Sequence, residues 1–184
     1  MVARMFQELG AAVLDADEIA HRVVEVGAPA WQELRQAFGP EFFRDNGELN
    51  RPRLAHLVFT APQARLRLNE IVHPYVGREI RARLEDLERR GVKMVLVEVP
   101  LLFEAGLEGG YDKVIVVDVD PREQVERLKA RDQRAAAEIL GIIEAQMPLK
   151  DKVSRADYVV DNRGSLEETR RQVQIIWGNL QKSS

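Results

Sequence analysis

Four short apolar runs divide the chain into alternating segments, and this alternation limits the possible folds more than any other feature. The runs are rich in valine and isoleucine without strict alternation, and they cover residues 11–14, 94–99, 114–119 and 158–160. Continuous apolar runs of this kind favour strands that are buried on both faces of a sheet. Helical patterns lie between them, and strands that alternate with helices predict a parallel sheet covered by helices on both sides.

Apolar residues at helical spacing mark the segments between the runs. These stripes are Val2, Met5, Phe6 and Leu9; Trp31, Leu34 and Phe38; Val76, Ile80, Leu84 and Leu87; Ile139, Ile142 and Ile143; and Leu166, Val173, Ile176 and Leu180. Ser165 and Glu168 have the spacing of a capping box, which predicts that the last helix begins there. The dipeptide Asn46-Gly47 predicts a turn.

Composition excludes several classes of protein. The 184 residues contain no cysteine, which excludes disulfides, catalytic thiols and thiolate metal sites and favours a cytoplasmic location. The 27 basic and 30 acidic residues give a formal net charge of −3, so the composition does not indicate a nucleic-acid surface. No apolar run approaches the roughly 20 residues needed to span a bilayer. We therefore expect small-molecule partners, with no nucleic acid and no membrane.

Acidic and amide side chains follow each of the four predicted strands. They are Asp15 and Asp17; Glu104 in the stretch PLLFE that begins at Pro100; Asp118 and Asp120; and Asp161 and Asn162. Ligands of parallel sheets bind outside the carboxyl ends of the strands, where a carboxylate can hold Mg²⁺ or accept a proton from a hydroxyl group. The alternative is structural, because Asp and Asn also cap helices and stabilise turns, and for any single acid this role is the more common one.

Basic residues gather after the third predicted strand. They are Arg127, Lys129, Arg131 and Arg134, with Arg155 further along. Guanidinium groups bind phosphate bidentately, so an arginine-bearing segment that closes over a nucleotide is one interpretation. A solvated helix face is the other, and the acids between these residues favour it on spacing alone.

His73-Pro74 is a further candidate for ligand binding. Proline disfavours helix at the residue before it, so we expect His73 to lie at a break between two helices, where its imidazole could contact a ligand. A histidine that is satisfied by backbone at a helix end is an equally good interpretation.

Several stretches, in order along nearly the whole chain, resemble the dephospho-CoA kinase family. They are FQELGAAVLDADEIAHRVVE, FGPEFFRDNGELNRPRLAHLVF, LNEIVHPYV, VEVPLLFEAGLEGGYDKVIVVDVD, RLKARD and EAQMPLKDKVSRADYVVDNRGSLEE. The motifs DAD, HP, PLLFE and DN are weak one by one, and their joint order and spacing carry the resemblance. It implies a P-loop kinase of the nucleoside-monophosphate-kinase type, which transfers the γ-phosphate of ATP to the ribose 3′-hydroxyl of dephospho-CoA in the last step of coenzyme A biosynthesis.

The resemblance also implies an architecture. It is one α/β kinase-like domain with a three-layer parallel sheet and helices on both faces, a helical acceptor-binding subdomain at about residues 28–90 and a lid at about residues 121–148. ATP would be the co-substrate, with Mg²⁺, and no metal-ligand residue is assigned.

The resemblance assigns roles to individual residues. Asp17 matches the catalytic base, Asp15 lies beside the transferring phosphate to support metal or water, and Arg131 matches the lid arginine that faces the ATP phosphates. Four residues match positions at the acceptor site, namely His73, Arg78, Leu101 and Leu102, and Asn162 lies in the loop near adenine. Glu98 departs from the residue that many relatives have, and the segment around residues 133–137 departs from the usual lid.

The main departure concerns the phosphate loop. The motif G-x-x-x-x-G-K-[ST] does not occur in the sequence, and neither does the buried strand that precedes it in the family and forms the centre of the sheet. Phosphoryl transfer depends on positioning and charge stabilisation, so we expect little or no kinase activity from this chain. We expect that the native protein begins upstream of Met1, and a genuinely short protein is the alternative.

Three functions follow from these observations. The first is a dephospho-CoA kinase, the second is a non-catalytic relative that binds dephospho-CoA or CoA, and the third is a kinase with another nucleoside-like acceptor. We expect a monomer or a weak homo-oligomer.

Overall fold

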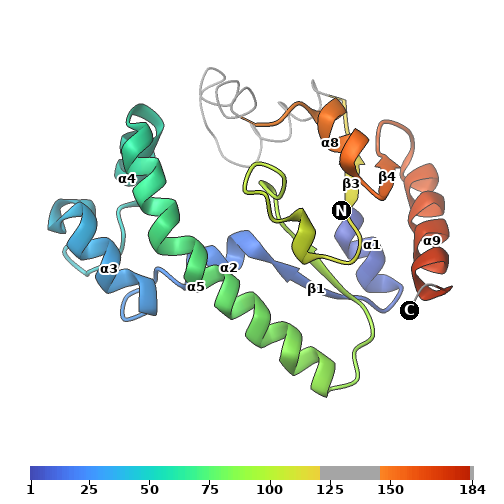
Figure 1. Cartoon of the computed structure of the whole chain (residues 1–184), viewed down its shortest axis with the longest axis horizontal. Helices are drawn as coiled ribbons and strands as arrows, with labels where there is room; N and C mark the ends of the chain where they lie inside the picture. The colour runs from blue at the N-terminus through green and yellow to red at the C-terminus, as the bar shows by residue number, and fades with distance from the viewer. Residues whose placement is uncertain (121–145, 183–184) are drawn as a thin grey trace. The chain divides into compact units, whose positions relative to one another are not determined.

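The computed structural model describes residues 1–120 and 146–182. The chain forms two compact units, one made of Met1–Ala11 with Pro100–Ser184 and the other of Ala12–Val99 (Figure 1). Each unit is an α/β structure with one pair of parallel strands.

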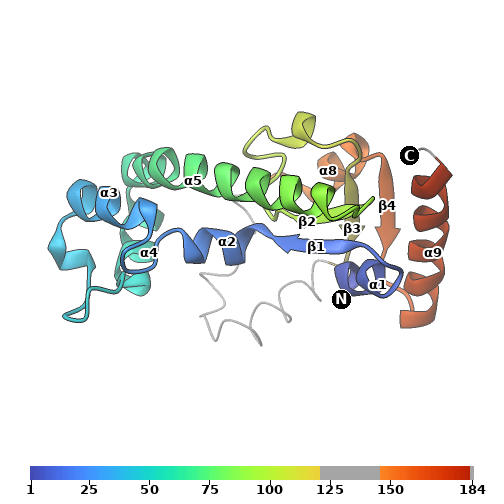
Figure 2. The same ribbon diagram turned by 90° about the horizontal axis from the view of Figure 1, so that it is seen from below.

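The Ala12–Val99 unit begins with a strand and ends with its partner. Strands β1 (Ala12–Asp15) and β2 (Val95–Glu98) run parallel and side by side, with Ala12 opposite Val95 and Asp15 opposite Glu98 (Figure 2). The helices between them are α2 (Ala16–Arg22), α3 (Pro29–Phe38), the 3₁₀ turn η1 (Pro40–Phe42), α4 (Arg51–Thr60) and α5 (Pro62–Arg89). Both strands and both predicted helical stripes of this unit are confirmed.

A hydrophobic core joins α2, α3 and α5. Ile19 and Leu34 are fully buried, and Ile71 of α5 is 5% exposed beside them. The predicted turn at Asn46-Gly47 is also confirmed, because Gly47 has a φ of +84° and its carbonyl accepts a 2.8 Å hydrogen bond from the Trp31 indole. The apolar stripes of the sequence therefore form the core that holds these helices together.

The expected helix break at His73-Pro74 is wrong. Helix α5 continues through both residues for 28 residues, with Pro74 in its interior. Proline removes one backbone hydrogen bond and crowds the preceding turn, which costs about 3 kcal/mol in a helix interior. Val72, Tyr75 and Val76 on either side of it pack against the buried core, and this packing offsets the cost.

The other unit contains the second pair of strands. Its elements are α1 (Val2–Glu8), the 3₁₀ turn η2 (Glu108–Gly110), β3 (Ile115–Asp118), α8 (Leu149–Arg155), β4 (Tyr158–Asp161) and α9 (Leu166–Lys182). Strands β3 and β4 are parallel, with Ile115 opposite Tyr158 and Asp118 opposite Asp161. These elements confirm the two predicted strands and the first and last predicted helices. The stripe at residues 139–143 lies outside the described residues.

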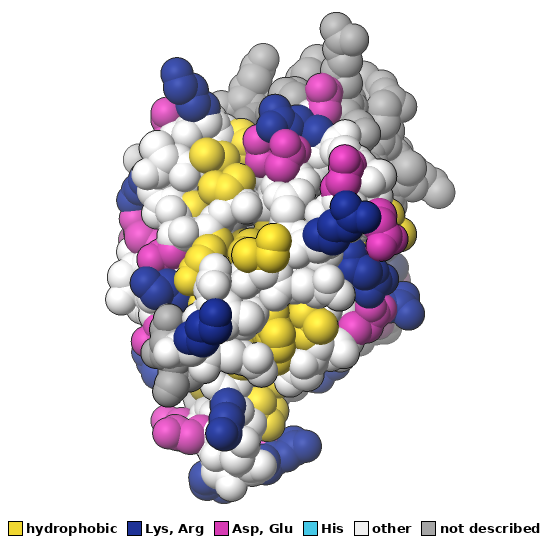
Figure 3. All heavy atoms as spheres, turned by 90° about the vertical axis from the view of Figure 1, so that its right-hand side faces the viewer, with side chains coloured by type: hydrophobic (Ala, Val, Ile, Leu, Met, Phe, Trp, Pro, Cys, Tyr) yellow, Lys and Arg dark blue, Asp and Glu magenta, His cyan; other side chains and the backbone are white. Residues whose placement is uncertain are grey.

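Helix α9 packs against α1 and begins with the predicted capping box. Glu168 Oε2 accepts a 2.7 Å hydrogen bond from Ser165 N–H, and Glu168 N–H donates to Ser165 Oγ over 3.3 Å. Arg170 of α9 also pairs with Glu8 of α1 over 2.7 Å. On the face that carries α9, charged side chains of both signs surround the hydrophobic ones (Figure 3). Local capping and one tertiary ion pair thus position the last helix.

The described strands form two separate two-stranded sheets and no longer ladder. The expectation of strands buried on both faces holds only in part, since Val116 and Val160 are buried while every residue of β1 and β2 is half-buried or exposed. No helix among the described residues is both long and apolar enough to cross a membrane.

Candidate active site

Each pair of strands ends in two acids that face each other. Asp15 of β1 lies opposite Glu98 of β2, and Asp118 of β3 lies opposite Asp161 of β4. All four residues are the last of their strands, so each acid pair lies at the carboxyl end of its own sheet, where ligands of parallel sheets bind. The two pairs differ in how their negative charge is balanced.

Asp15 is a helix cap as well as a predicted site residue. Its Oδ1 accepts hydrogen bonds from the backbone N–H groups of Asp17 (2.8 Å) and Glu18 (3.1 Å), which places Asp15 at the N-cap of α2. Asp17 lies in the first turn of that helix and is exposed. The structural and the functional interpretations of Asp15 are therefore compatible, because the cap fixes the turn from which Asp17 projects.

Glu98 adds a third acid to this strand end. Partial burial, together with the negative charges of Asp15 and Asp17, raises the pKa of Glu98 above its ordinary value. Within the described residues, no lysine or arginine forms an ion pair with Asp15 or Glu98. The residue appeared in the sequence only as a departure from the usual pattern. The signal that could have found it is its position next to the last residue of the second predicted strand.

The carboxylates at the β1–β2 end suit proton transfer and cation binding. A carboxylate there can accept a proton from a hydroxyl group, and carboxylate oxygens are the ligands that Mg²⁺ prefers. Among residues 1–120 and 146–182, no group of three or more histidine, aspartate or glutamate side chains could hold a metal ion by itself. A Mg²⁺ ion at this strand end would take most of its ligands from water and from substrate phosphates.

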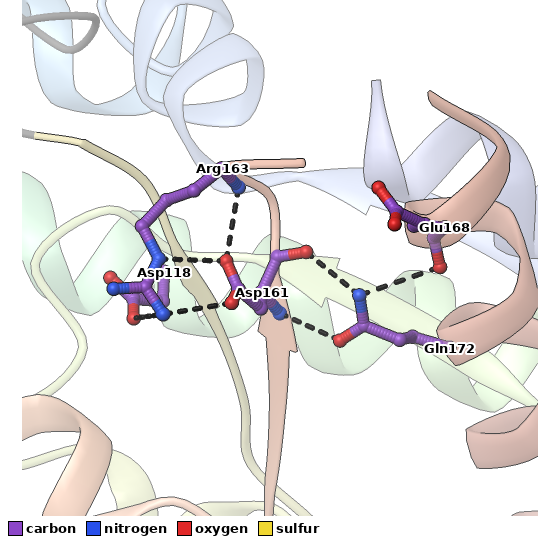
Figure 4. A network of polar contacts seen from close by, with 5 residues as sticks. All are labelled: Asp118, Asp161, Arg163, Glu168 and Gln172. Atoms are coloured by element: carbon purple, nitrogen blue, oxygen red, sulfur yellow. Dashed lines mark hydrogen bonds and ion pairs between the residues drawn. The ribbon is translucent and has the colours of Figure 1, made fainter. Parts of the chain in front are cut away.

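The β3–β4 end is neutralised by an arginine that sequence reasoning missed. Arg163 donates from Nε and Nη2 to the two carboxylate oxygens of Asp161 over 2.8 and 2.7 Å, and its Nη2 lies 3.5 Å from Asp118 Oδ2 (Figure 4). These hydrogen bonds lower the pKa of Asp161 to about 2. One guanidinium thus bridges the two acids, and its contact with Asp118, which is distant along the chain, has no signature in the sequence.

Gln172 of α9 fixes the end of β4 from the other side. Its amide oxygen accepts a 2.8 Å hydrogen bond from Asp161 N–H, and its Nε2 donates to the Asp161 carbonyl over 2.8 Å (Figure 4). The Gln172 side chain therefore makes the two backbone hydrogen bonds with Asp161 that a neighbouring strand would otherwise make. An open pocket beside it is lined by Asp161, Gly164, Glu168, Arg171 and Gln172.

Asn162, the residue predicted to lie near adenine, is buried. It is 5% exposed, and its Oδ1 accepts a 3.1 Å hydrogen bond from Thr169 Oγ1, which belongs to a residue of α9 that is fully buried. The side chain therefore joins the loop after β4 to α9. Through this contact Asn162 fixes the conformation of the loop. The side chains that the loop exposes belong to the residues next to Asn162.

The predicted acceptor residues His73 and Arg78 both lie on α5 and are exposed. The Arg78 guanidinium lies 4.4 Å from the centre of the Tyr75 ring, and the Tyr75 hydroxyl donates a hydrogen bond to Glu33 of α3. That hydrogen bond raises the pKa of Tyr75. Arg78 is therefore held in a defined position by an aromatic ring that is itself fixed to a second helix.

Leu101 and Leu102 differ in exposure. Leu101 is 48% exposed, whereas Leu102 packs against the buried cluster of Phe103, Val114 and Val116. Only Leu101 therefore presents a large apolar surface that a ligand could cover.

Arg131 lies outside the described residues, together with Arg127, Lys129 and Arg134. Arg155 lies on α8, where it pairs with Glu108 and covers the Phe103 ring at 4.9 Å. Its guanidinium therefore serves a contact within the fold.

Comparisons with known proteins agree with this arrangement. The model of the dephospho-CoA kinase family matches residues 1–168. The dephospho-CoA kinase of Bacillus cereus is 44% identical over 178 residues, which cover 97% of this chain and 89% of the relative. That of Geobacillus kaustophilus is 45% identical over 184 residues, which cover 98% of this chain and 92% of the relative.

Solved structures show the same fold. The crystal structure of a Thermus thermophilus protein matches with a TM-score of 0.82 at 37% identity, covering 97% of this chain and 90% of that one. The dephospho-CoA kinase of Campylobacter jejuni matches with a TM-score of 0.70 at 22% identity, which supports the fold alone. With the α/β architecture and the acidic strand ends in place, the family match over most of its length shows that the chain belongs to the dephospho-CoA kinases, a family of ATP-dependent phosphotransferases.

Proposed function

We propose that this chain provides the acceptor and base groups of a dephospho-CoA kinase, with Asp17 as the catalytic base. In this reaction the ribose 3′-oxygen of dephospho-CoA attacks the γ-phosphorus of ATP, the bond to the β,γ-bridging oxygen breaks, and ADP leaves. The proton of the 3′-hydroxyl passes to the Asp17 carboxylate. The observation that carries the proposal is the acidic end of β1 and β2, where Asp17 follows the opposed pair Asp15 and Glu98.

The two strand ends would serve different parts of the reaction. A group of three acids at one strand end favours removal of a proton and attracts Mg²⁺, so we assign the β1–β2 end to the phosphoryl-transfer chemistry. The β3–β4 end carries Asp118 and Asp161 already bridged by Arg163, so a nucleotide would meet less negative charge there. We assign the loop from Asp161 to Gly164 to the adenosine part of ATP, with Asn162 shaping the loop from within.

Mg²⁺ would bind through ATP phosphates and water, with Asp15 as the carboxylate nearest the transferred group. The ion would supply charge neutralisation for the β- and γ-phosphates. Asp15 can contribute to this only through an oxygen that its capping hydrogen bonds leave accessible, since Oδ1 already accepts two backbone N–H groups.

The missing phosphate loop limits what the chain can do. The motif G-x-x-x-x-G-K-[ST] does not occur in the 184 residues, so the backbone N–H groups and lysine that cradle the ATP phosphates in P-loop enzymes have no counterpart in the sequence. This specific observation favours a second candidate function, a protein that binds dephospho-CoA or CoA without catalysis. Under both functions the acceptor groups on α5 and Leu101 are used.

Calorimetry and a turnover assay on the purified chain test the proposal. We expect dephospho-CoA to bind, ATP to bind weakly or not at all, and ADP formation to stay near background when both are present. Ordinary turnover that depends on dephospho-CoA would contradict the predicted inactivity. A chain that does not bind dephospho-CoA but binds another nucleoside would instead support the third function, a kinase with a different acceptor.

The remaining expectations stay predictions. Size-exclusion chromatography with light scattering tests the expected monomer or weak homo-oligomer, and a panel of nucleoside triphosphates tests the nucleotide preference. A cytoplasmic location rests on the cysteine-free composition alone.

A further inference from the structure

The loop that follows β2 is attached to α8 by a partly buried ion pair. Glu104 Oε1 lies 2.7 Å from Lys152 Nζ, and the same oxygen accepts a 2.8 Å hydrogen bond from Met147 N–H. The Glu104 and Lys152 side chains are 19% and 13% exposed, the lowest values among the ion pairs of the described residues. One carboxylate oxygen thus holds both α8 and the segment that leads into it.

A second attachment lies one helical turn further along. Glu108 pairs with Arg155 of α8, and the Arg155 guanidinium covers the ring of Phe103, which is only 6% exposed. Phe103 in turn packs in the cluster that contains Val114 and Val116 of the β3 region. Three residues therefore attach this segment to α8: Phe103 through its ring, and Glu104 and Glu108 through ion pairs.

Leu101 is left on the accessible side of this loop. It is 48% exposed, although it stands only two residues before the buried Phe103. Because about half of Leu101 is exposed, the direction of its side chain depends on the conformation of the loop that carries it. Glu104 is the nearest residue along the chain with polar contacts to another element.

We propose that Glu104 and Lys152 are positioning residues for the acceptor, because their ion pair holds the Pro100–Ala105 loop in the conformation that presents Leu101 to dephospho-CoA. The inference rests on the proposed function, in which this loop lines the acceptor site. It assigns a role to the acid of the PLLFE stretch that is neither catalysis nor metal binding.

The energetics of the pair support a role in holding the loop. Removing one partner of a poorly exposed ion pair leaves the other charge without compensation, which destabilises the conformation that contains it. Burial alone would raise the pKa of Glu104, but the hydrogen bonds from Lys152 and Met147 N–H outweigh it and lower that pKa. The carboxylate is therefore ionised at neutral pH and available to Lys152.

Three variants and one matched control test the proposal on the whole chain. Glu104→Ala and Lys152→Met remove the pair from either side, and Glu104→Gln keeps an oxygen that can accept from Met147 N–H. Glu8→Ala is the control, because Glu8 forms an ion pair of the same 2.7 Å length with Arg170 on α1 and α9. Each protein is measured by calorimetry with dephospho-CoA well below its melting temperature, and by hydrogen exchange of the amides of residues 101–107.

We expect Glu104→Ala and Lys152→Met to weaken dephospho-CoA binding at least about tenfold, which corresponds to about 1.4 kcal/mol. Glu104→Gln should lose less, Glu8→Ala should bind as the wild type does, and the loop amides should exchange faster only in the Glu104 and Lys152 variants. A purely structural pair would lower the melting temperature and leave the dissociation constant unchanged, and this result would overturn the proposal. A wild-type chain that does not bind dephospho-CoA would instead overturn the proposed function, and the assigned role with it.

Discussion

Asp15 and Glu98 face each other across the last rung of the β1–β2 ladder, and no lysine or arginine of the described residues forms an ion pair with either. Asp118 and Asp161 face each other in the same way at the end of β3 and β4, but Arg163 joins them. The two acid pairs therefore occupy the same position at the ends of their strands but differ in how their charge is balanced. Asp15 and Glu98 repel each other, whereas the Arg163 guanidinium stabilises Asp118 beside Asp161.

The repulsion at the first pair predicts that Glu98→Gln stabilises the fold at neutral pH. The folded-state pKa of Glu98 is raised above 4.5, so its contribution to stability is present below pH 4.5 and is lost as the pH rises through the folded pKa. The neutral amide avoids this loss. Because the side chain is more than one third exposed, we expect a gain below about 1 kcal/mol.

Thermal unfolding of the wild type and Glu98→Gln between pH 4 and pH 8 measures this effect. The melting temperatures should converge at the acidic end and separate as the pH rises. Glu25→Gln, on an exposed residue of the same unit, is the control and should show no such trend. A variant that is less stable than the wild type at pH 7 would show that the Glu98 carboxylate has a favourable partner.

The second pair predicts the opposite pH dependence. The pKa of Asp161 is about 2, below its ordinary value of 3.8, so the stability from this group is fully present above pH 3.8 and is lost as the pH falls through about 2. In Arg163→Gln the hydrogen bonds from the guanidinium are gone, and Asp118 and Asp161 repel each other. We therefore expect the Asp161 carboxyl to titrate at a higher pH in this variant.

Carbon-detected NMR titration of the aspartate carboxyl groups reports the shift directly. Arg171→Gln removes another arginine, which lies on α9, and is the matched control. It should leave the titration midpoint of the Asp161 carboxyl near 2. An unchanged midpoint in Arg163→Gln would mean that the backbone N–H of residue 163, and not its side chain, lowers the pKa.

The sequence predicts the parts of this fold that depend on near neighbours. The four strands, the stripes of α3, α5 and α9, and the capping box of Ser165 and Glu168 follow from spacing within one segment. His73 was placed at a break because the local effect of Pro74 is strong, and the wrong prediction arose because packing of α5 against α2 and α3 outweighs it.

The contacts that define the site are harder to predict. Arg163 and Gln172 act on Asp161 through side chains of a loop and of another helix, and Glu104 meets Lys152 almost 50 residues further along the chain. Nothing in the spacing of such pairs distinguishes them from solvated charges. Asp15 and Asp17 could be identified because strand ends collect ligands, but the opposition of Asp15 and Glu98 needed the register of the ladder.

Removal of the capping hydroxyl in Ser165→Ala should destabilise the chain by about 1 kcal/mol. Ser165 Oγ accepts from Glu168 N–H and donates to Glu168 Oε2 over 2.8 Å, and no methyl group can replace either contact. Urea unfolding measures the change. Ser154→Ala is the control, since that hydroxyl only donates to the Asp151 carbonyl within α8. Equal losses in both variants would show that the capping box adds nothing beyond an ordinary surface hydroxyl.

The proposed base predicts that Asp17→Asn affects chemistry and not acceptor binding. A general base contributes roughly 10² to 10⁴ in rate, so any turnover that the chain shows should fall by at least about 100-fold. The dissociation constant for dephospho-CoA should change less than about threefold, since the amide preserves size and hydrogen bonding. Glu18→Gln is the control on the next residue, whose carboxylate pairs with Arg22. Unchanged turnover in Asp17→Asn would remove Asp17 from the base role.

Arg78 provides a test of the acceptor site that does not depend on turnover. Its guanidinium is held over the Tyr75 ring at 4.4 Å, and Tyr75 is fixed to Glu33 of α3, so the charge is placed before a ligand arrives. Arg78→Ala should weaken dephospho-CoA binding about tenfold, the effect of one hydrogen bond to a charged group. Arg81→Ala removes an exposed arginine one turn further along α5 and should leave the affinity unchanged. Calorimetry at two salt concentrations completes the comparison, because a contact with a phosphate weakens as salt rises. If both variants bind as the wild type does, the acceptor diphosphate is not held by this face of α5, and the assignment of Arg78 to the acceptor site is wrong.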